Sequence, residues 1–201
     1  MGFPSELALA TRNEGKIREI LQICRDWPVK WRTALELPES PQVEETGRTY
    51  FENALLKARA MADATGLPAV ADDSGIEVDA LGGEPGPRSA RFAGLHATDA
   101  QNLRLLIEQI SDVPDSLRTA RYRCVAACAW PDGREVWAEG LCDGRLILEP
   151  RGSEGFGYDP IFVPRSEQHR TMAELPPEEK NAISHRGRAL RSLGEGLRAD
   201  P

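Results

Sequence analysis

The stretch LPAVADDSGIEVDALGGEPGPRSARFAG, residues 67–94, decides the fold class of this chain. Its apolar start, Leu67 to Ala71, leads directly into two carboxylates, Asp72 and Asp73. An apolar run bounded by such residues indicates a buried strand that ends at the carboxylates. Strand ends carry the chemistry of α/β proteins, and adjacent carboxylates there need a metal ion or a cationic partner to compensate them. We therefore expect a hard-cation site facing a cleft, followed by a Gly- and Pro-rich loop that can wrap a ligand.

Strands and helices alternate on both sides of this stretch. Apolar patterning predicts strands at residues 6–11, 69–71, 119–130, 134–141 and 161–164. Helical spacing, with capping boxes at Thr49-x-x-Glu52 and Thr98-x-x-Gln101, predicts helices at residues 15–24, from 49 to about 66, from 98 to 110, and in two segments that meet near Ser184. The turn Pro131-Asp132-Gly133 joins two of the strands as an antiparallel hairpin. The predicted class is α/β, with a mixed sheet in one domain over residues 1–201.

Composition and charge describe an ordinary soluble globular chain. The 201 residues are 40% hydrophobic and 28% charged, with a formal net charge of −7. An acidic chain is a poor match for nucleic acid or an anionic membrane surface, so we expect neither as a partner. No apolar run approaches the roughly 18 residues of a membrane span, and the N-terminus has no signal-peptide h-region. A cytoplasmic location is expected.

The four cysteines and three histidines show no metal-binding spacing. No C-x2-C pair occurs, which favours small buried hydrophobes in a reducing compartment; the cysteines are Cys24, Cys124, Cys128 and Cys142. The histidines, His96, His169 and His185, are far apart in the sequence, which disfavours zinc catalysis.

A polar turn, Thr11-Arg12-Asn13-Glu14-Gly15-Lys16, lies between the first predicted strand and the first predicted helix. Its hydroxyl, amide and ammonium groups, with the free N–H groups of the helix start, can contact a phosphate chain. It is not a Walker A loop, because Ala10 and Ile17 stand where that motif needs Gly and Ser or Thr. A capped helix start with a solvated lysine explains the same residues equally well.

A second acidic pair occurs in Glu44-Glu45-Thr46-Gly47, within a Pro-rich irregular stretch. Acidic loop residues are usually just solvated. Close to Asp72 and Asp73, however, they would complete a Mg²⁺ site, since Mg²⁺ prefers one or two carboxylates with waters and substrate phosphates.

Two stretches near the C-terminus can recognise a base. The rings in Gly155-Phe156-Gly157-Tyr158-Asp159 can stack on it, although their packing into the core is slightly favoured. Lys180 and Ser184-His185-Arg186-Gly187 offer donors for the 6-oxo group of a purine. Taken alone, this second run favours an N-capped amphipathic helix with exposed basic residues.

In order along nearly the whole chain, these stretches resemble the motifs of one protein family. The matching segments are TRNEGK at 11–16, EETGRTYFENALLKA at 44–58, ADDSGIEVDALGGEPGPRSARFAG at 71–94, GFGYDPIF at 155–162, and AEL with EEKNAISHRGRAL between 173 and 190. Each motif is modest, but their order is highly specific. The chain is similar to the non-canonical purine nucleoside triphosphate pyrophosphatases, the XTP/dITP diphosphatases, a group that is inosine triphosphate pyrophosphatase-like.

The resemblance implies Mg²⁺-dependent hydrolysis of ITP, dITP and XTP to the nucleoside monophosphate and pyrophosphate. It implies an elongated mixed β-sheet flanked by helices, with two lobes and a central substrate cleft, in a homodimer. Asp73 would be the catalytic carboxylate and, with Glu44, a magnesium ligand. Asp72 would join Lys57 in the network around the phosphates. The substrate-binding residues would be Thr11, Arg12, Asn13, Glu14, Gly15, Lys16, Lys57, Ser74, Phe156, Gly157, Tyr158, Asp159, Lys180, His185 and Arg186.

Arg12 departs from the family pattern, which has a small residue at this position. The guanidinium adds positive charge and bulk near the phosphate loop. It either supplies another phosphate contact or points to solvent.

The expected chemistry is attack of water on the α-phosphorus, with Asp73 as the base. Donors aimed at the 6-oxo group would make adenine nucleotides poor substrates. Two other functions stay open. One is a nucleotide-binding module without turnover, against which Glu44, Asp72 and Asp73 argue. The other is a pyrophosphatase for modified pyrimidine or ordinary nucleotides, which the SHRG run disfavours without excluding.

Overall fold

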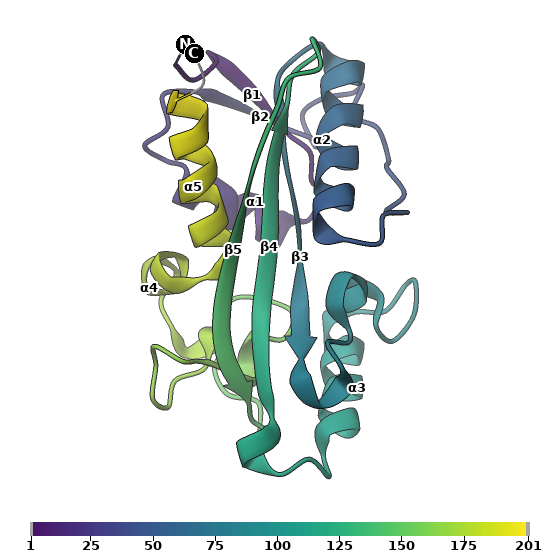
Figure 1. Cartoon of the computed structure of the whole chain (residues 1–201), viewed down its shortest axis with the longest axis vertical. Coiled ribbons are helices and arrows are strands. Elements are labelled where there is room, and N and C mark those ends of the chain that lie inside the picture. The colour runs from purple at the N-terminus through teal and green to yellow at the C-terminus, as the bar shows by residue number, and fades with distance from the viewer. Residues whose placement is uncertain (1, 200–201) are drawn as a thin grey trace. The chain divides into compact units, whose positions relative to one another are not determined.

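The computed structural model describes residues 2–199 as an α/β fold (Figure 1). The strands are β1 (Glu6–Leu9), β2 (Lys30–Thr33), β3 (Ala69–Val78), β4 (Thr119–Ala129), β5 (Glu135–Leu146) and β6 (Phe162–Pro164). The helices are α1 (Glu14–Ile23), α2 (Tyr50–Thr65), α3 (Asp99–Ile110), α4 (Pro177–Ile183) and α5 (His185–Ala199). Short 3₁₀ helices lie between several of these elements.

The six strands form one mixed sheet in the order β2-β1-β3-β4-β5-β6. β1 pairs in parallel with β2 and β3, whereas β5 and β6 are antiparallel. β4 and β5 are neighbours joined by a turn in which Gly133 donates to the carbonyl of Trp130. The predicted class, α/β with a mixed sheet flanked by helices, is confirmed.

The chain divides into two compact units. Unit 1 contains the chain up to Asp73, Cys124–Gly140, and the chain from Arg186 onward; unit 2 contains Ser74–Arg123 and Leu141–His185. The divisions fall inside β3, β4 and β5 and at the start of α5, so the chain passes repeatedly from one unit to the other. One domain over residues 1–201 stays a prediction.

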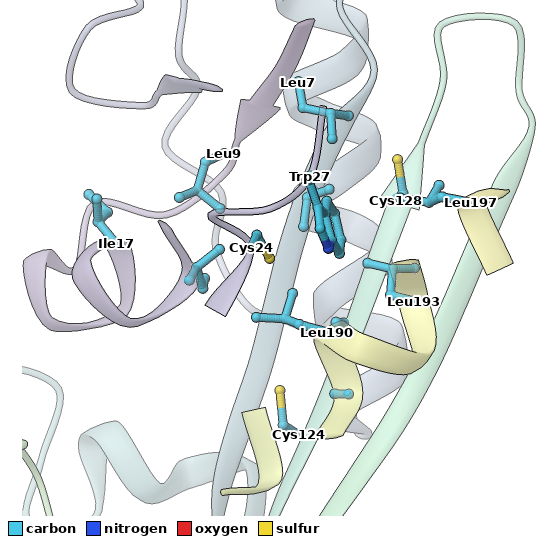
Figure 2. Packing of buried hydrophobic residues seen from close by; sticks show 14 residues of the cluster. Leu7, Leu9, Ile17, Cys24, Trp27, Cys124, Cys128, Leu190, Leu193 and Leu197 are labelled. Atoms are coloured by element: carbon cyan, nitrogen blue, oxygen red, sulfur yellow. The ribbon is translucent and has the colours of Figure 1, made fainter. Parts of the chain in front are cut away.

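In unit 1, helices cover both faces of the sheet. On one face, β1, β3 and β4 pack against α1 and α5; Figure 2 shows this cluster, with Leu7 and Leu9 of β1 and Leu193 of α5. On the other face, Ala8 of β1 and Ala71 of β3 pack against α2. Side chains of a strand alternate between its faces, so neighbouring residues of one strand meet different helices. This alternation decides where the charged residues of β3 point.

Unit 2 has a buried core of its own. Leu106 and Ile110 of α3, Tyr122 of β4 and Phe162 of β6 are all nearly inaccessible to solvent and belong to one cluster. The rings of Tyr122 and Phe162 pack at a centroid distance of 4.6 Å. These residues form the support for the polar groups of this unit.

The helix predictions are confirmed to within a residue or two at their ends. Capping boxes at Thr49 and Thr98 open α2 and α3, and Gly66 ends α2 in the left-handed region, with a φ of 69°. β2 was not expected, because its sequence, KWRT, has no apolar alternation and only four residues. The strand forms because its backbone pairs with β1, and the side-chain pattern does not predict this pairing.

The cysteine prediction is confirmed as far as burial goes. All four side chains are buried, and desolvation raises the pKa of Cys24 and Cys128 to about 12.

The sequence also predicts no membrane-spanning segment. Among residues 2–199, no helix combines the length and the apolar character needed to span a bilayer.

The predicted end of the third strand is wrong. β3 does not stop at the two carboxylates but continues from Ala69 to Val78, so Asp72 and Asp73 lie in its interior. A strand that carries two buried charges needs compensation on each face. The helices on the two faces of unit 1 provide that compensation.

Candidate active site

The two neighbouring carboxylates of β3 belong to different networks of unit 1. Asp72 is 1% exposed and meets cations from α1 and α5, whereas Asp73 is 4% exposed and meets polar groups of α2. The strand period of two places consecutive side chains on opposite faces. The two carboxylates therefore do not point toward a common ligand. Each has its own set of partners.

The network around Asp72 is a buried set of ion pairs. Lys16 Nζ and Arg186 Nη2 each lie 3.1 Å from Asp72 Oδ2, and Arg186 Nη1 lies 2.5 Å from Glu19 Oε2. Burial by itself would raise the pKa of Asp72, but the charges of Lys16 and Arg186 outweigh it and hold the pKa well below its ordinary value. Cys124 Sγ, 3.8 Å from the same carboxylate, has its pKa raised by burial. Asp72 thus stays ionised and anchors α1 and α5 to the sheet.

The network around Asp73 joins a carboxylate, an amide and an ammonium. Lys57 Nζ lies 3.3 Å from Asp73 Oδ1 and 2.6 Å from Glu45 Oε1, and Asn53 Nδ2 donates to Asp73 Oδ2 at 3.2 Å. Burial raises the pKa of Asp73, with Lys57 and Lys16 opposing the rise. For Lys57, burial opposes ionisation, but the charges of Asp73 and Glu45 raise the pKa overall. A carboxylate with a raised pKa accepts a proton more readily than an ordinary one.

The residues present fit a magnesium ion in their chemistry. Asp73 and Glu45 direct carboxylate oxygens at one cationic position, now held by Lys57 Nζ, and Mg²⁺ takes one or two carboxylates with waters and phosphate oxygens. Glu44, the predicted ligand, is exposed on the same loop, where its carbonyl accepts from the N–H of Thr46. Among residues 2–199, no three His, Cys, Asp or Glu side chains gather as a metal-binding group. A metal here would need substrate or water oxygens, and the role of Glu44 stays a prediction.

The predicted phosphate loop is the N-terminus of α1. Asn13 caps the helix, its Oδ1 accepting from the N–H of Lys16 at 3.0 Å, and Thr11 Oγ1 accepts from the N–H of Asn13 at 3.3 Å. Arg12 donates to the carbonyl of Ser40 at 3.1 Å, so its guanidinium tethers the following loop. Glu14 is exposed, and its Oε2 lies 3.7 Å from Arg18 Nη1. Both nitrogens of Lys16 are thus engaged, its N–H by Asn13 and its Nζ by Asp72, and the contact of this loop with phosphate stays a prediction.

Unit 2 holds the second group of predicted residues around Asp159, which is 3% exposed. Lys180 Nζ lies 2.5 Å from Asp159 Oδ2, and the N–H of Phe156 donates to the same oxygen at 2.9 Å. Tyr122 donates from its hydroxyl to Asp159 Oδ1 at 3.2 Å. Gly155, with a φ of +74°, lets this carboxylate and ammonium approach the backbone, since a Cβ there would collide with both. Tyr122, Phe156, Asp159 and Lys180 thus form a hydrogen-bonded polar group, the Asp159 platform, rather than a solvated loop.

The aromatic residues of unit 2 divide between platform and core. The imidazole of His185, 5% exposed, stacks on Tyr122 at 4.5 Å with an interplanar angle of 10°. Lys180 Nζ lies 5.1 Å from the centre of the Phe156 ring. Tyr158 is buried and donates to the carbonyl of Ser89 at 2.7 Å, which is the core packing that the sequence slightly favoured for these rings. Phe156 is the half-buried ring, and its stacking on a base stays a prediction.

The other predicted substrate residues are divided between the two units. Arg186 is 2% exposed and occupied by Asp72 and Glu19 in unit 1, whereas its neighbour His185 belongs to unit 2. Ser74, which follows Asp73 in β3, is half-buried, and Gly157 donates its N–H to Asp99 at 3.0 Å. The contacts that these residues make with a substrate stay predictions.

Sequence reasoning missed several members of these networks. They are Glu19, Asn53 and Tyr122, and Glu45 was noted only as part of an acidic pair. One signal was available for Asn53, which precedes Lys57 by four residues and therefore shares its face of α2. Nothing in the sequence pointed to Tyr122, because its partners lie far along the chain.

Buried carboxylates held against lysines, in both units of an α/β fold, are typical of enzyme sites, and they indicate the class: an α/β enzyme. Comparison with known proteins narrows the class. The sequence profile of the Ham1 family matches residues 7–196. The chain belongs to the Ham1 family, which confirms the resemblance noted in the sequence.

Individual relatives agree along almost their full length. A dITP/XTP pyrophosphatase from Streptomyces coelicolor is 56% identical over 191 residues, which is 94% of this chain and 95% of that protein. A solved HAM1 protein from Coxiella burnetii has a TM-score of 0.86 and 45% identity, covering 96% of this chain and 98% of that one. The structure of a nucleoside-triphosphatase, dITP/XTP pyrophosphatase, from Mycobacterium abscessus gives a TM-score of 0.74 at 47% identity, covering 94% and 98%.

Proposed function

We propose that this chain is a Mg²⁺-dependent pyrophosphatase that hydrolyses ITP, dITP and XTP to the nucleoside monophosphate and pyrophosphate. The observation that carries the proposal is the buried carboxylate of Asp73, held between Asn53 and Lys57, with Glu45 on the other side of the ammonium. The S. coelicolor relative named dITP/XTP pyrophosphatase supports the class of substrate.

The proposed reaction is hydrolysis at the α-phosphorus. Asp73 accepts a proton from the attacking water, whose oxygen bonds to the α-phosphorus as the bond to the α–β bridging oxygen breaks. Lys57 and Lys16 offset negative charge on the phosphates, as cationic clamps do in phosphoryl transfer. Asp73, with Glu44 or Glu45, would hold Mg²⁺, which supplies further charge neutralisation when bound. The leaving group is pyrophosphate.

The proposed base recognition belongs to the Asp159 platform. Lys180 and His185 carry N–H donors, and a 6-oxo purine offers an acceptor where adenine has an amino group. A site built on buried donors rejects a ligand that leaves them without acceptors. Adenine nucleotides are therefore expected to be poor substrates, and the orientation of Asp159 and Lys180 by Tyr122 and Phe156 keeps the donors fixed.

A panel of nucleoside triphosphates with product identification tests the proposal. ITP, dITP, XTP, GTP and ATP are incubated with the protein in Mg²⁺ and, separately, in excess EDTA. We expect monophosphate and pyrophosphate from the first three in Mg²⁺, weak turnover of ATP, and none in EDTA. Orthophosphate as the product would contradict the bond assignment. Equal kcat/KM for ITP and ATP would refute the base recognition, and intact ITP would refute the enzyme.

We extend the proposal to the cellular setting. Free nucleotides are the proposed substrate, so we place the protein in the cytoplasm, with neither nucleic acid nor a membrane as partner. The homodimer follows from the resemblance to the family. The formal net charge of −7 supports the absence of charge-driven nucleic-acid binding.

A further inference from the structure

We infer that Asn53 is a positioning residue for the proposed reaction: its side-chain amide ties the acidic loop, residues 44–47, to the carboxylate of Asp73. The inference rests on the proposed function of Asp73 and adds a residue that the sequence motifs did not single out. The proposed role of Asn53 involves no contact with phosphate or base. It acts through the two groups that it joins.

Both the oxygen and the nitrogen of the Asn53 side-chain amide are hydrogen-bonded. Asn53, on α2, is 0% exposed; its Oδ1 accepts from the N–H of Gly47 at 2.8 Å, and its Nδ2 donates to Asp73 Oδ2 at 3.2 Å. A buried amide is costly unless its groups are hydrogen-bonded, and here the acceptor faces the loop and the donor faces the strand. An alanine would make neither bond, and an ionised aspartate would accept but not donate.

Gly47 is the matching half of this contact. A Cβ at residue 47 would lie 2.5 Å from Asn53 Oδ1 and 2.8 Å from Glu52 Cβ, distances that real side chains do not adopt. The loop reaches α2 this closely only because residue 47 has no side chain. Glycine is thus required at this position by close approach and not by its backbone conformation.

Two points of α2 therefore hold the same assembly. Asn53 fixes the loop at Gly47 and Asp73 at Oδ2, while Lys57, one helical turn later, contacts Glu45 and Asp73 Oδ1. Lys57 supplies charge, but its ammonium can rotate and exchange partners. The amide of Asn53 is planar and buried, so it sets where the loop carboxylates stand relative to Asp73. Groups that orient metal ligands and catalytic carboxylates typically matter about 10-fold to 100-fold in affinity or activity.

Asn102 provides a matched control in unit 2. It is also a buried asparagine, 2% exposed, with its Oδ1 accepting from the N–H of Ala93 at 2.8 Å and its Nδ2 donating to the carbonyl of Ala90 at 3.0 Å. It ties a loop to a helix as Asn53 does but contacts no carboxylate. The variants are Asn53→Ala, Asn53→Asp, Gly47→Ala and Asn102→Ala, each measured beside the wild type in the full chain.

Kinetics, metal binding and stability are measured together. The readouts are kcat and KM for ITP, the Mg²⁺ concentration that gives half-maximal rate, Mg²⁺ binding by calorimetry without nucleotide, and thermal unfolding. For Asn53→Ala we expect kcat to fall about 10-fold to 100-fold and the Mg²⁺ requirement to rise, with KM for ITP nearly unchanged. A purely structural asparagine would lower the melting temperature and the active fraction, but not shift the Mg²⁺ requirement. Asn102→Ala is expected to behave in that second way.

Each outcome decides the inference. Asn53→Asp keeps the bond to Gly47 but sets a carboxylate against Asp73, so we expect a loss at least as large as for alanine; wild-type activity would overturn the donation to Asp73. Equal Mg²⁺ requirements in wild type and Asn53→Ala would overturn the inference. Should that variant not fold, Gly47→Ala must show the same shift. If wild-type protein leaves ITP intact, the proposed function fails, and calorimetry decides: unchanged Mg²⁺ affinity in the Asn53 variants then overturns the inference as well.

Discussion

Asp72 and Asp73, adjacent residues of β3, have different roles in this protein. Lys16 and Arg186 both contact Oδ2 of Asp72 and hold this carboxylate ionised, whereas Asp73 is buried with weaker compensation and has a raised pKa. The first is placed to stabilise the packing of helices on the sheet. The second has the environment of a proton acceptor. Replacing each aspartate in turn distinguishes the two roles.

Replacing Asp73 by asparagine tests its chemical role. The change keeps the size of the side chain but removes the group that accepts the proton, so kcat for ITP should fall about 100-fold to 10,000-fold. Thermal unfolding should show that the fold is retained. Turnover close to that of the wild type would remove Asp73 from the role of base.

Replacing Asp72 by asparagine is expected to cost stability rather than chemistry. Breaking a buried ion pair by removing one partner costs roughly 3–5 kcal/mol, because Lys16 and Arg186 lose their compensation. Urea unfolding at pH 7 measures the loss. A change below about 1 kcal/mol would contradict the pairing.

The difference in free energy of unfolding between wild type and Asp72→Asn should also depend on pH. The folded pKa of Asp72 is depressed, so its contribution is complete above the unfolded value of about 3.9 and is lost as pH falls toward the folded value. The difference in free energy of unfolding between wild type and Asp72→Asn should therefore shrink below about pH 4. Unfolding in urea from pH 7 to 3 follows it, and a difference that grows on acidification would refute the assignment.

Tyr122 offers a conservative test of the base platform. Tyr122→Phe removes the hydroxyl that donates to Asp159 but keeps the ring that stacks on His185. A hydrogen bond to a charged group is worth about 1.5–3 kcal/mol, and its loss removes one of the contacts that orient the Asp159 carboxylate beside Lys180. The ratio of kcat/KM for ITP over that for ATP should fall by about threefold to tenfold, with kcat for ITP little changed. An unchanged ratio would show that the hydroxyl has no part in specificity.

Among the elements, α2 carries the residues that contact Asp73. It carries Asn53 and Lys57 on one face, and its N-terminus is fixed by a capping box in which Thr49 Oγ1 accepts from the N–H of Glu52 at 3.1 Å. Its alanines pack on the strand residues of the same unit, which brings the helix close to β3. The start of α2 therefore supports the residues that contact Asp73.

The capping boxes of α2 and α3 make a matched pair. Thr49→Ala and Thr98→Ala each remove one cap and should each cost about 1 kcal/mol of stability, measured by urea unfolding. Fraying of α2 disturbs Asn53. The first turn of α3 contacts Gly157 of the proposed base site through Asp99 but carries no residue of the Asp73 network. Thr98→Ala should therefore affect KM for ITP, and only Thr49→Ala should lower kcat. Equal kcat in the two variants would mean that the first turn of α2 is not needed to hold the site.

At the scale of the whole molecule, the chain is two units, each with a buried core and a buried carboxylate–lysine pair. The proposed homodimer is a property of this scale. Light scattering at micromolar concentration should give twice the mass of one chain, unchanged in high salt if apolar contacts dominate the association. The mass of a single chain would contradict the homodimer.

The sequence alone determined what local patterns can encode. Capping boxes, helical spacing and the Pro-Asp-Gly turn specify α2, α3 and the β4–β5 hairpin, because these depend on residues only a few positions apart. The order of the motifs identified the family. Tertiary structure decided the partners: the strand continues through Asp72 and Asp73 because cations from different helices compensate each face. Arg186 reaches Asp72 across 114 positions, and Asn53 reaches Asp73 across 20. Such contacts follow from how helices pack on a sheet, which no local pattern of residues records.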